Sequence, residues 1–214
     1  MTPLGLSQAP IDTGDASRGI RVEWEVRARQ VEEVFRYAGT TTAFSYFGAI
    51  LTFGVLWDTD DARRGVIWLG YATVVACMRF AVVMAYEHRD RALSVDPWIQ
   101  WVIGLNLMAG IQWGFLGTLL FPMDPGYRQL YTIMVITCFV GGSITAYSAI
   151  PWAHPALSLP ATIPTAVFLF FVQGGVHIFA GVAAVGFCFA IVYYAANLTR
   201  HLEARFRLRS STRT

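Results

Sequence analysis

The chain has no lysine, few charged residues of either sign, and no acidic residue in any of its long apolar stretches. Only 14% of its 214 residues are charged, which is too few to cover the surface of a soluble domain of this size. All 16 basic residues are arginines and the net charge is only +2, so the composition gives no reason to expect a nucleic-acid partner. A membrane protein is therefore expected, with the lipid bilayer as its main partner.

Cysteine and histidine are also scarce, and their spacing does not indicate a metal site. The three cysteines, Cys77, Cys138 and Cys188, lie inside apolar stretches without a CxxC spacing, so no disulfide or zinc site is predicted. The four histidines are scattered along the chain, with His154 placed in a loop between two apolar stretches. Walker, nucleophile-elbow, HExxH, kinase and dinucleotide motifs are missing. We expect no metal, no cofactor and no catalytic activity in the chain itself.

Hydrophobic residues fill the rest of the sequence, at 55% of the total. They form six stretches of 17 to 25 residues, a length at which a helix crosses the hydrocarbon of a bilayer. The stretches are 39–57, 65–86, 97–121, 130–150, 157–173 and 176–198. The predicted fold is all-α, a polytopic bundle of six transmembrane helices. Residues 157–173 are the least secure span, because a re-entrant segment there would move the C-terminus to the other side.

Arginines in the flanks and short loops predict the orientation. With six spans both termini share a side, and that side carries 12 arginines against three on the other. The three are Arg63, Arg64 and Arg128. Both termini are therefore expected in the cytoplasm.

The ends of the chain differ in character from the spans. Residues 1–19 read as a disordered leader, and residues 20–38 as an amphipathic juxtamembrane helix running into the first span. That helix either anchors the first span at the interface or offers a contact surface to a partner. Residues 199–214 begin as a helical continuation of the sixth span and are interpreted as a cytoplasmic signalling-helix stub.

Arg79 is the one charged residue inside a predicted span. At 1.5 Å per residue it lies about 10 Å from the end of its span, and Asn106 of the third span lies at a similar depth. Ser143 of the fourth span falls at a comparable level. We therefore expect a polar layer of Arg79, Asn106 and Ser143, and these residues are candidates for binding a ligand or signal. The alternative is that Arg79 extends to the interface and the other two make ordinary interhelical hydrogen bonds.

The third span also carries Gln112 and Trp113, inside a run of glycines spaced four residues apart at Gly110 and Gly114. Gln112 and Trp113 complete the candidate ligand or signal residues. The glycine spacing allows close helix contact, either within one bundle or between the two chains of a dimer. Gly141, Gly142 and Ser143 in the fourth span, and the prolines of the fifth, mark expected kinks.

Several loose patterns together resemble the N-terminal membrane regions of bacterial diguanylate cyclases (GGDEF proteins) and hybrid histidine kinases. They are Leu56-Trp57, Arg79, Gly110–Gly114, Leu159-Pro160 and Leu202–Arg209. The resemblance implies a sensory module of the bacterial inner membrane, usually a homodimer, that passes a conformational change to a cytoplasmic output domain. These 214 residues contain no GGDEF or kinase domain, so the output domain is expected in cis or in trans.

Three function classes remain open from the sequence. The first is the sensory module, for which short outer loops favour a lipophilic small-molecule ligand over a soluble one. The second is a small membrane transporter or channel, with Arg79 or Asn106 on its path. The third, a membrane-embedded enzyme or assembly factor, is disfavoured because the spans lack acids and paired histidines.

Overall fold

A computed structural model describes residues 13–57, 62–89, 94–123, 126–172 and 175–211, and in these ranges it contains helices and no strand. It confirms an all-helical fold with six helices long and apolar enough to cross a membrane. The helices are α1 (Thr13–Leu56), α2 (Ala62–Glu87), α3 (Asp96–Leu116), α4 (Tyr127–Gly142), α5 (Ile144–Tyr147), α6 (Ala153–Phe171) and α7 (Gly175–Ser211). The short α5 continues the span that α4 begins, which runs from Tyr127 to Tyr147.

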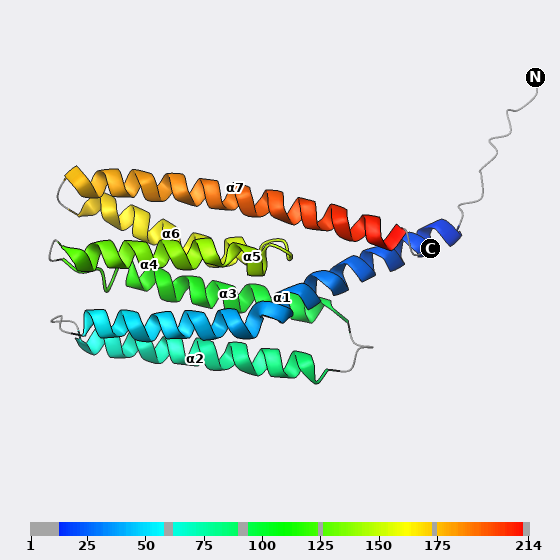
Figure 1. The fold of residues 1–214 in the computed structure, drawn as a ribbon, viewed down its shortest axis with the longest axis horizontal. Coiled ribbons are helices and arrows are strands. Elements are labelled where there is room, and N and C mark those ends of the chain that lie inside the picture. Colours follow the sequence, from blue (N-terminus) through cyan, green and yellow to red (C-terminus); the bar gives the residue numbers. More distant parts are fainter. Residues whose placement is uncertain (1–12, 58–61, 90–93, 124–125, 173–174, 212–214) are drawn as a thin grey trace, which may run out of the picture.

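The long helices run up and down in one elongated bundle (Figure 1). Along the chain α1 packs on α2 and α2 on α3, whereas α3 packs mainly on α6, and α6 on α7. The α4 and α5 segments contact both α1 and α6. The start of α1 and the end of α7 lie at one end of the bundle, here called the termini side (Figure 1). The opposite end, where α1 meets α2 and α6 meets α7, is called the far side.

The first helix is longer than the sequence predicted. It begins at Thr13, so residues 13–19 of the predicted disordered leader are helical, while residues 1–12 lie outside the described residues. The amphipathic segment and the first span form one continuous helix. Its apolar positions Val31, Val34 and Phe35 are buried in the bundle, and the Phe35 ring stacks on Tyr86 with centroids 3.7 Å apart. These three side chains therefore pack against the rest of the chain, whereas Trp24 of the same segment is 51% exposed.

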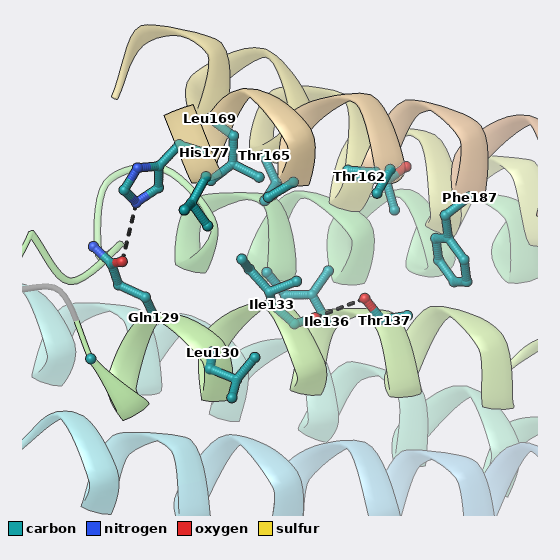
Figure 2. A pocket seen from close by; sticks show the side chains of 15 residues that line it. Gln129, Leu130, Ile133, Ile136, Thr137, Thr162, Thr165, Leu169, His177 and Phe187 are labelled. Atoms are coloured by element: carbon teal, nitrogen blue, oxygen red, sulfur yellow. Dashed lines mark hydrogen bonds between the residues drawn. The ribbon is translucent and has the colours of Figure 1, made fainter. Parts of the chain in front are cut away.

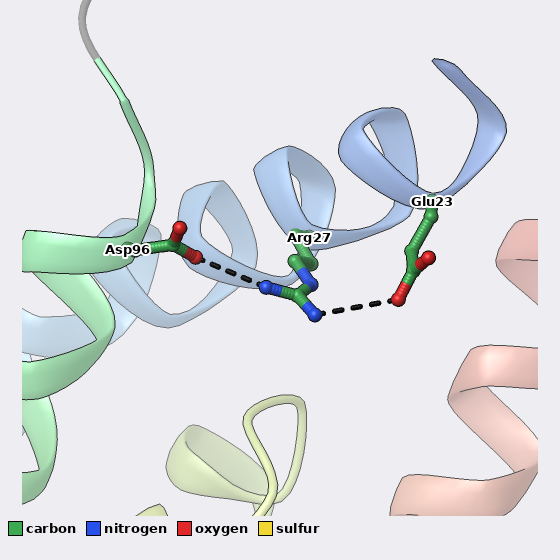
Figure 3. A network of polar contacts seen from close by, with 3 residues as sticks. All are labelled: Glu23, Arg27 and Asp96. Atoms are coloured by element: carbon green, nitrogen blue, oxygen red, sulfur yellow. Dashed lines mark hydrogen bonds and ion pairs between the residues drawn. The ribbon is translucent and has the colours of Figure 1, made fainter. Parts of the chain in front are cut away.

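A polar contact also joins this part of α1 to the start of α3 (Figure 3). The Arg27 guanidinium donates to the carboxylate of Asp96 at 3.1 Å and to that of Glu23 at 3.3 Å. About half or more of each side chain is exposed, at 49% for Arg27 and 65% for Asp96. Exposed ion pairs of this kind stabilise a fold only weakly.

Replacing Asp96 with alanine should change the free energy of unfolding by less than about 1 kcal/mol, because water and salt screen the exposed pair. Thermal unfolding of the detergent-solubilised protein, followed by tryptophan fluorescence, measures this. A clearly larger loss would mean that the ion pair, and not the buried face of α1, holds the helix extension in place.

Two helix ends differ from the apolar stretches that predicted them. Helix α3 ends at Leu116, with Gly117 as its C-cap, although apolar residues continue to Phe121. Helix α6 begins at Ala153, four residues before the predicted span, because Trp152 adopts a left-handed conformation (φ 68°) that starts a new helix. Pro155 fits in the first turn, where its missing N–H is not needed. His154 is consequently a helix residue and not, as predicted, a loop residue.

Two glycines of α3, Gly110 and Gly114, lie directly against α6. A Cβ atom added to Gly114 would lie 2.2 Å from the carbonyl oxygen of Pro160, and one on Gly110 would lie 2.4 Å from that of Leu157. The Pro160 carbonyl has no helical partner because Pro164, four residues on, lacks an N–H. The glycine spacing thus serves close packing within one chain, as the first of the two sequence interpretations expected.

Helix α7 leaves the bundle on the termini side. It spans 37 residues, and its backbone stays helical through residues 199–209, as predicted. Where it passes the end of α5, the Thr199 hydroxyl donates to the carbonyl oxygen of Ser148 at 2.6 Å. This contact fixes the position of α7 at the point where it begins to extend beyond the other helices.

Candidate polar site around Arg79

Arg79 of α2 is buried, with 6% of its surface exposed, and its guanidinium points into the bundle. One terminal nitrogen donates to the side-chain oxygen of Asn106 and to the carbonyl oxygen of Leu105 at 3.3 Å. The other donates to the hydroxyl oxygen of Tyr147 at 3.1 Å. The predicted contact between Arg79 and Asn106 is therefore present. The alternative in which Arg79 extends to the membrane interface does not describe this structure.

The Asn106 branch of this network reaches α6. While its oxygen accepts from Arg79, the amide nitrogen of Asn106 donates to the carbonyl oxygen of Ala153 at 2.9 Å. That carbonyl belongs to the first residue of α6. Asn106 is 1% exposed, so both halves of its amide are satisfied inside the protein.

The Tyr147 branch reaches α1. The Tyr147 oxygen lies 3.2 Å from the Thr41 hydroxyl, which itself donates to the carbonyl oxygen of Tyr37 at 2.9 Å. Since Thr41 uses its proton on the backbone, Tyr147 donates to Thr41 and accepts from Arg79. Hydrogen bonds in such a chain polarise and strengthen one another. Neither Thr41 nor Tyr147 was a sequence candidate.

Arg79 has neutral acceptors in place of an acidic partner. In the described part of the chain, the three salt bridges involve Arg27 and Arg36 and leave the interior of the bundle without an ion pair. The Tyr147 ring adds the negative face of its π-system, with the guanidinium carbon 5.6 Å from the ring centroid. A buried charge without a counter-ion depends on all of its hydrogen bonds, because losing one leaves the charge less compensated.

The other predicted residues, Ser143, Gln112 and Trp113, do not bond to Arg79. Ser143 is buried, but its hydroxyl donates to the carbonyl of Val140, within its own helix, at 2.8 Å. The expected three-residue layer is thus incomplete, because the break between α4 and α5 turns this hydroxyl back on the backbone. Gln112 lines a small cavity with Arg79. Its backbone carbonyl oxygen accepts a hydrogen bond from the indole N–H of Trp68 at 2.7 Å. Trp113 stacks on Phe139 with centroids 4.7 Å apart.

His154 supports the same region from α6. It is fully buried, and its Nε2 donates to the Val140 carbonyl oxygen at 3.1 Å, so the proton lies on Nε2. Val140 O therefore accepts from both Ser143 and His154 at the end of α4, where the helix is interrupted. The interruption at Ser143, predicted from Gly141 and Gly142, is held in place by the start of α6.

The two cavities lined by Arg79 have volumes of about 10 and 30 Å³. The smaller volume is close to that of a single water, and neither accommodates a metabolite. Within the described ranges, histidine, cysteine, aspartate and glutamate nowhere gather in groups of three that could hold a metal ion. The site is a hydrogen-bonded connection between helices, built around one cation.

No protein-family model, curated protein or solved structure matches this chain.

Proposed function

We propose that the chain is a membrane-embedded sensory module that transmits a signal to a cytoplasmic output domain of the diguanylate cyclase or histidine kinase type. The proposal places it in the bacterial inner membrane as a homodimer with both termini in the cytoplasm. The output domain is supplied in cis or in trans, and the chain itself is not an enzyme. The resemblance in the sequence and the polar network around Arg79 both favour this function.

One observation carries the proposal: the segment 147–153 binds side chains from four long helices. Tyr147 bonds to Thr41 of α1 and to Arg79 of α2, and the Ala153 carbonyl bonds to Asn106 of α3. The Ser148 carbonyl bonds to Thr199 of α7. The two helices that extend beyond the bundle, α1 and α7, are thus tied to the same short segment.

This arrangement offers a physical route for a signal. A shift of 147–153 would break these hydrogen bonds and favour one of two packings of the bundle over another. The interruption at Ser143 separates this segment from the regular part of α4. Movement of the segment would shift α1 and α7 together, and α7 would carry the change to the output domain.

The alternative function is a small membrane transporter or channel with Arg79 or Asn106 on its path. The cavities of about 10 and 30 Å³ at Arg79 give this function less support, because a path would require α2, α3 and α5 to separate. Solute flux in proteoliposomes that is lost on replacing Arg79 would favour transport over signalling.

A reporter fusion tests the sensory function. With a diguanylate cyclase domain joined after Thr214, Tyr147→Phe and Thr199→Val should each change cyclic di-GMP in cells by at least about fivefold, the lower end of typical coupling between sites. Tyr193→Phe is the matched control for Tyr147→Phe. It also removes a tyrosine hydroxyl, but from a side chain that is 68% exposed on α7. If both variants leave the cyclic di-GMP level unchanged while protein level and assembly are preserved, the proposal is contradicted.

A further inference from the structure

A second feature of the bundle is a cavity of about 510 Å³ between α4, α6 and α7 (Figure 2). Ile133 and Ile136 of α4, Leu169 of α6 and Phe187 of α7 supply much of its wall. It runs from Val176 to Phe187 along α7, which corresponds to about 16 Å at 1.5 Å per residue. It is separate from the Arg79 network, with which it shares no lining residue.

The threonines that line this cavity are bonded within their own helices. Thr137 donates to the Ile133 carbonyl at 2.8 Å, Thr162 to that of Ser158 at 2.7 Å, and Thr165 to that of Ala161 at 3.0 Å. Their hydroxyl protons are therefore not available to an occupant. What these residues present to the cavity is mainly their methyl groups.

The polar groups at the far-side end of the cavity are only partly paired (Figure 2), because the buried His177 Nδ1 has no hydrogen-bond partner among the described residues. His177 Nε2 lies 3.1 Å from the side-chain oxygen of Gln129, and the Gln129 amide donates to the Pro122 carbonyl at 2.9 Å. Since the Gln129 oxygen only accepts, His177 donates to it. An occupant of this cavity consequently gains contact with carbon along its length, and polar neighbours only at the His177–Gln129 end.

The surroundings indicate where an occupant comes from. All three helices around the cavity are candidate membrane spans, so the medium next to them is hydrocarbon. A volume of 510 Å³ spread over this length is too narrow for a helix from a second chain, which is 10–12 Å wide. Concave, mostly apolar cavities of about 300–1,000 Å³ are typical of small-ligand sites.

We infer that this cavity binds one alkyl chain of a membrane lipid, which enters from the bilayer and keeps its polar head at the His177–Gln129 end. The length of the cavity, its methyl-lined walls and its position among membrane spans each match an extended hydrocarbon chain. This site does not depend on the sensory function, because lipid binding can be measured without any output domain. If both hold, α7 is the element that the lipid and the output domain share.

Photolabelling of the full chain tests the inference. The protein is placed in phosphatidylcholine nanodiscs containing a phosphatidylcholine with a diazirine in the middle of one acyl chain, irradiated, and mapped by mass spectrometry. We expect several-fold more adducts on Ile133 and Phe187, which line the cavity, than on Phe179 and Phe189, which are 77% and 74% exposed on α7. If adducts on the unaltered chain are spread evenly over the cavity and the outer surface, the inference is overturned.

A pair of tryptophan variants sharpens the result. Ala184→Trp places an indole in the cavity and should remove the cavity adducts, whereas Val182→Trp, on the exposed face of α7, should leave them in place. Cavity adducts that persist in folded Ala184→Trp, or crosslinks to a second chain in place of lipid adducts, would overturn the inference. Changed reporter output without cavity labelling would reject the lipid site and leave the sensory proposal standing.

Discussion

Replacing Gly114 with leucine is expected to separate α3 from α6 and to prevent assembly of the bundle. A single added Cβ would already lie 2.2 Å from the Pro160 carbonyl oxygen, which is backbone and has no room to turn aside. Overpacking at such a contact costs about 3 kcal/mol or more, so we expect little monodisperse protein. Fluorescence-detected size-exclusion chromatography of a tagged, detergent-solubilised chain measures the loss.

The matched control for this variant is Gly104→Leu, on the same helix. A Cβ added to Gly104 meets nothing within 4 Å, so the bulk of leucine is tolerated there and helix propensity improves. Its yield should equal or exceed that of the unaltered chain. Equal yields for the two variants would show that α3 and α6 do not pack as closely as described.

Replacing Asn106 with leucine should be the most damaging change in the polar network. The guanidinium of Arg79 would lose an acceptor in a buried position, and the Ala153 carbonyl would lose its donor. Removing one partner of a buried charge typically costs about 3–5 kcal/mol. Thermal unfolding in detergent should therefore occur at a markedly lower temperature than for the unaltered chain.

The double variant Arg79→Leu with Asn106→Leu separates charge from packing. Removing the cation together with its acceptor leaves two apolar side chains, so much of the stability lost in Asn106→Leu should return. If the losses of the two single variants simply add in the double variant, Arg79 and Asn106 do not interact, and the network described here is incorrect.

Hydropathy predicted the six spans because a helix in lipid must be long and apolar throughout. It located the helix ends less well, since the apolar run continues past Leu116 and the helical backbone begins before Leu157. The contact between Arg79 and Asn106 could be predicted because both lie at one depth on helices joined by a short loop. The use of Gly110 and Gly114 in packing could be predicted from their spacing alone.

Tyr147, Thr41 and the Ala153 carbonyl could not be predicted in the same way. Their meeting depends on the break at Ser143 and on the left-handed Trp152, which together turn the chain back toward Arg79. No periodic pattern in the sequence records the direction of such a turn. The cavity between α4, α6 and α7 was missed for a similar reason, because it depends on how three helices pack and not on any motif.

We propose that the chain crosses the membrane six times with both ends on its arginine-rich side. Fusions of alkaline phosphatase and of green fluorescent protein, made separately before Met1 and after Thr214, test it most directly in bacterial cells. Fluorescence and no phosphatase activity are expected at both ends. Phosphatase activity at either end, or a chain that purifies in soluble form without detergent, would contradict it.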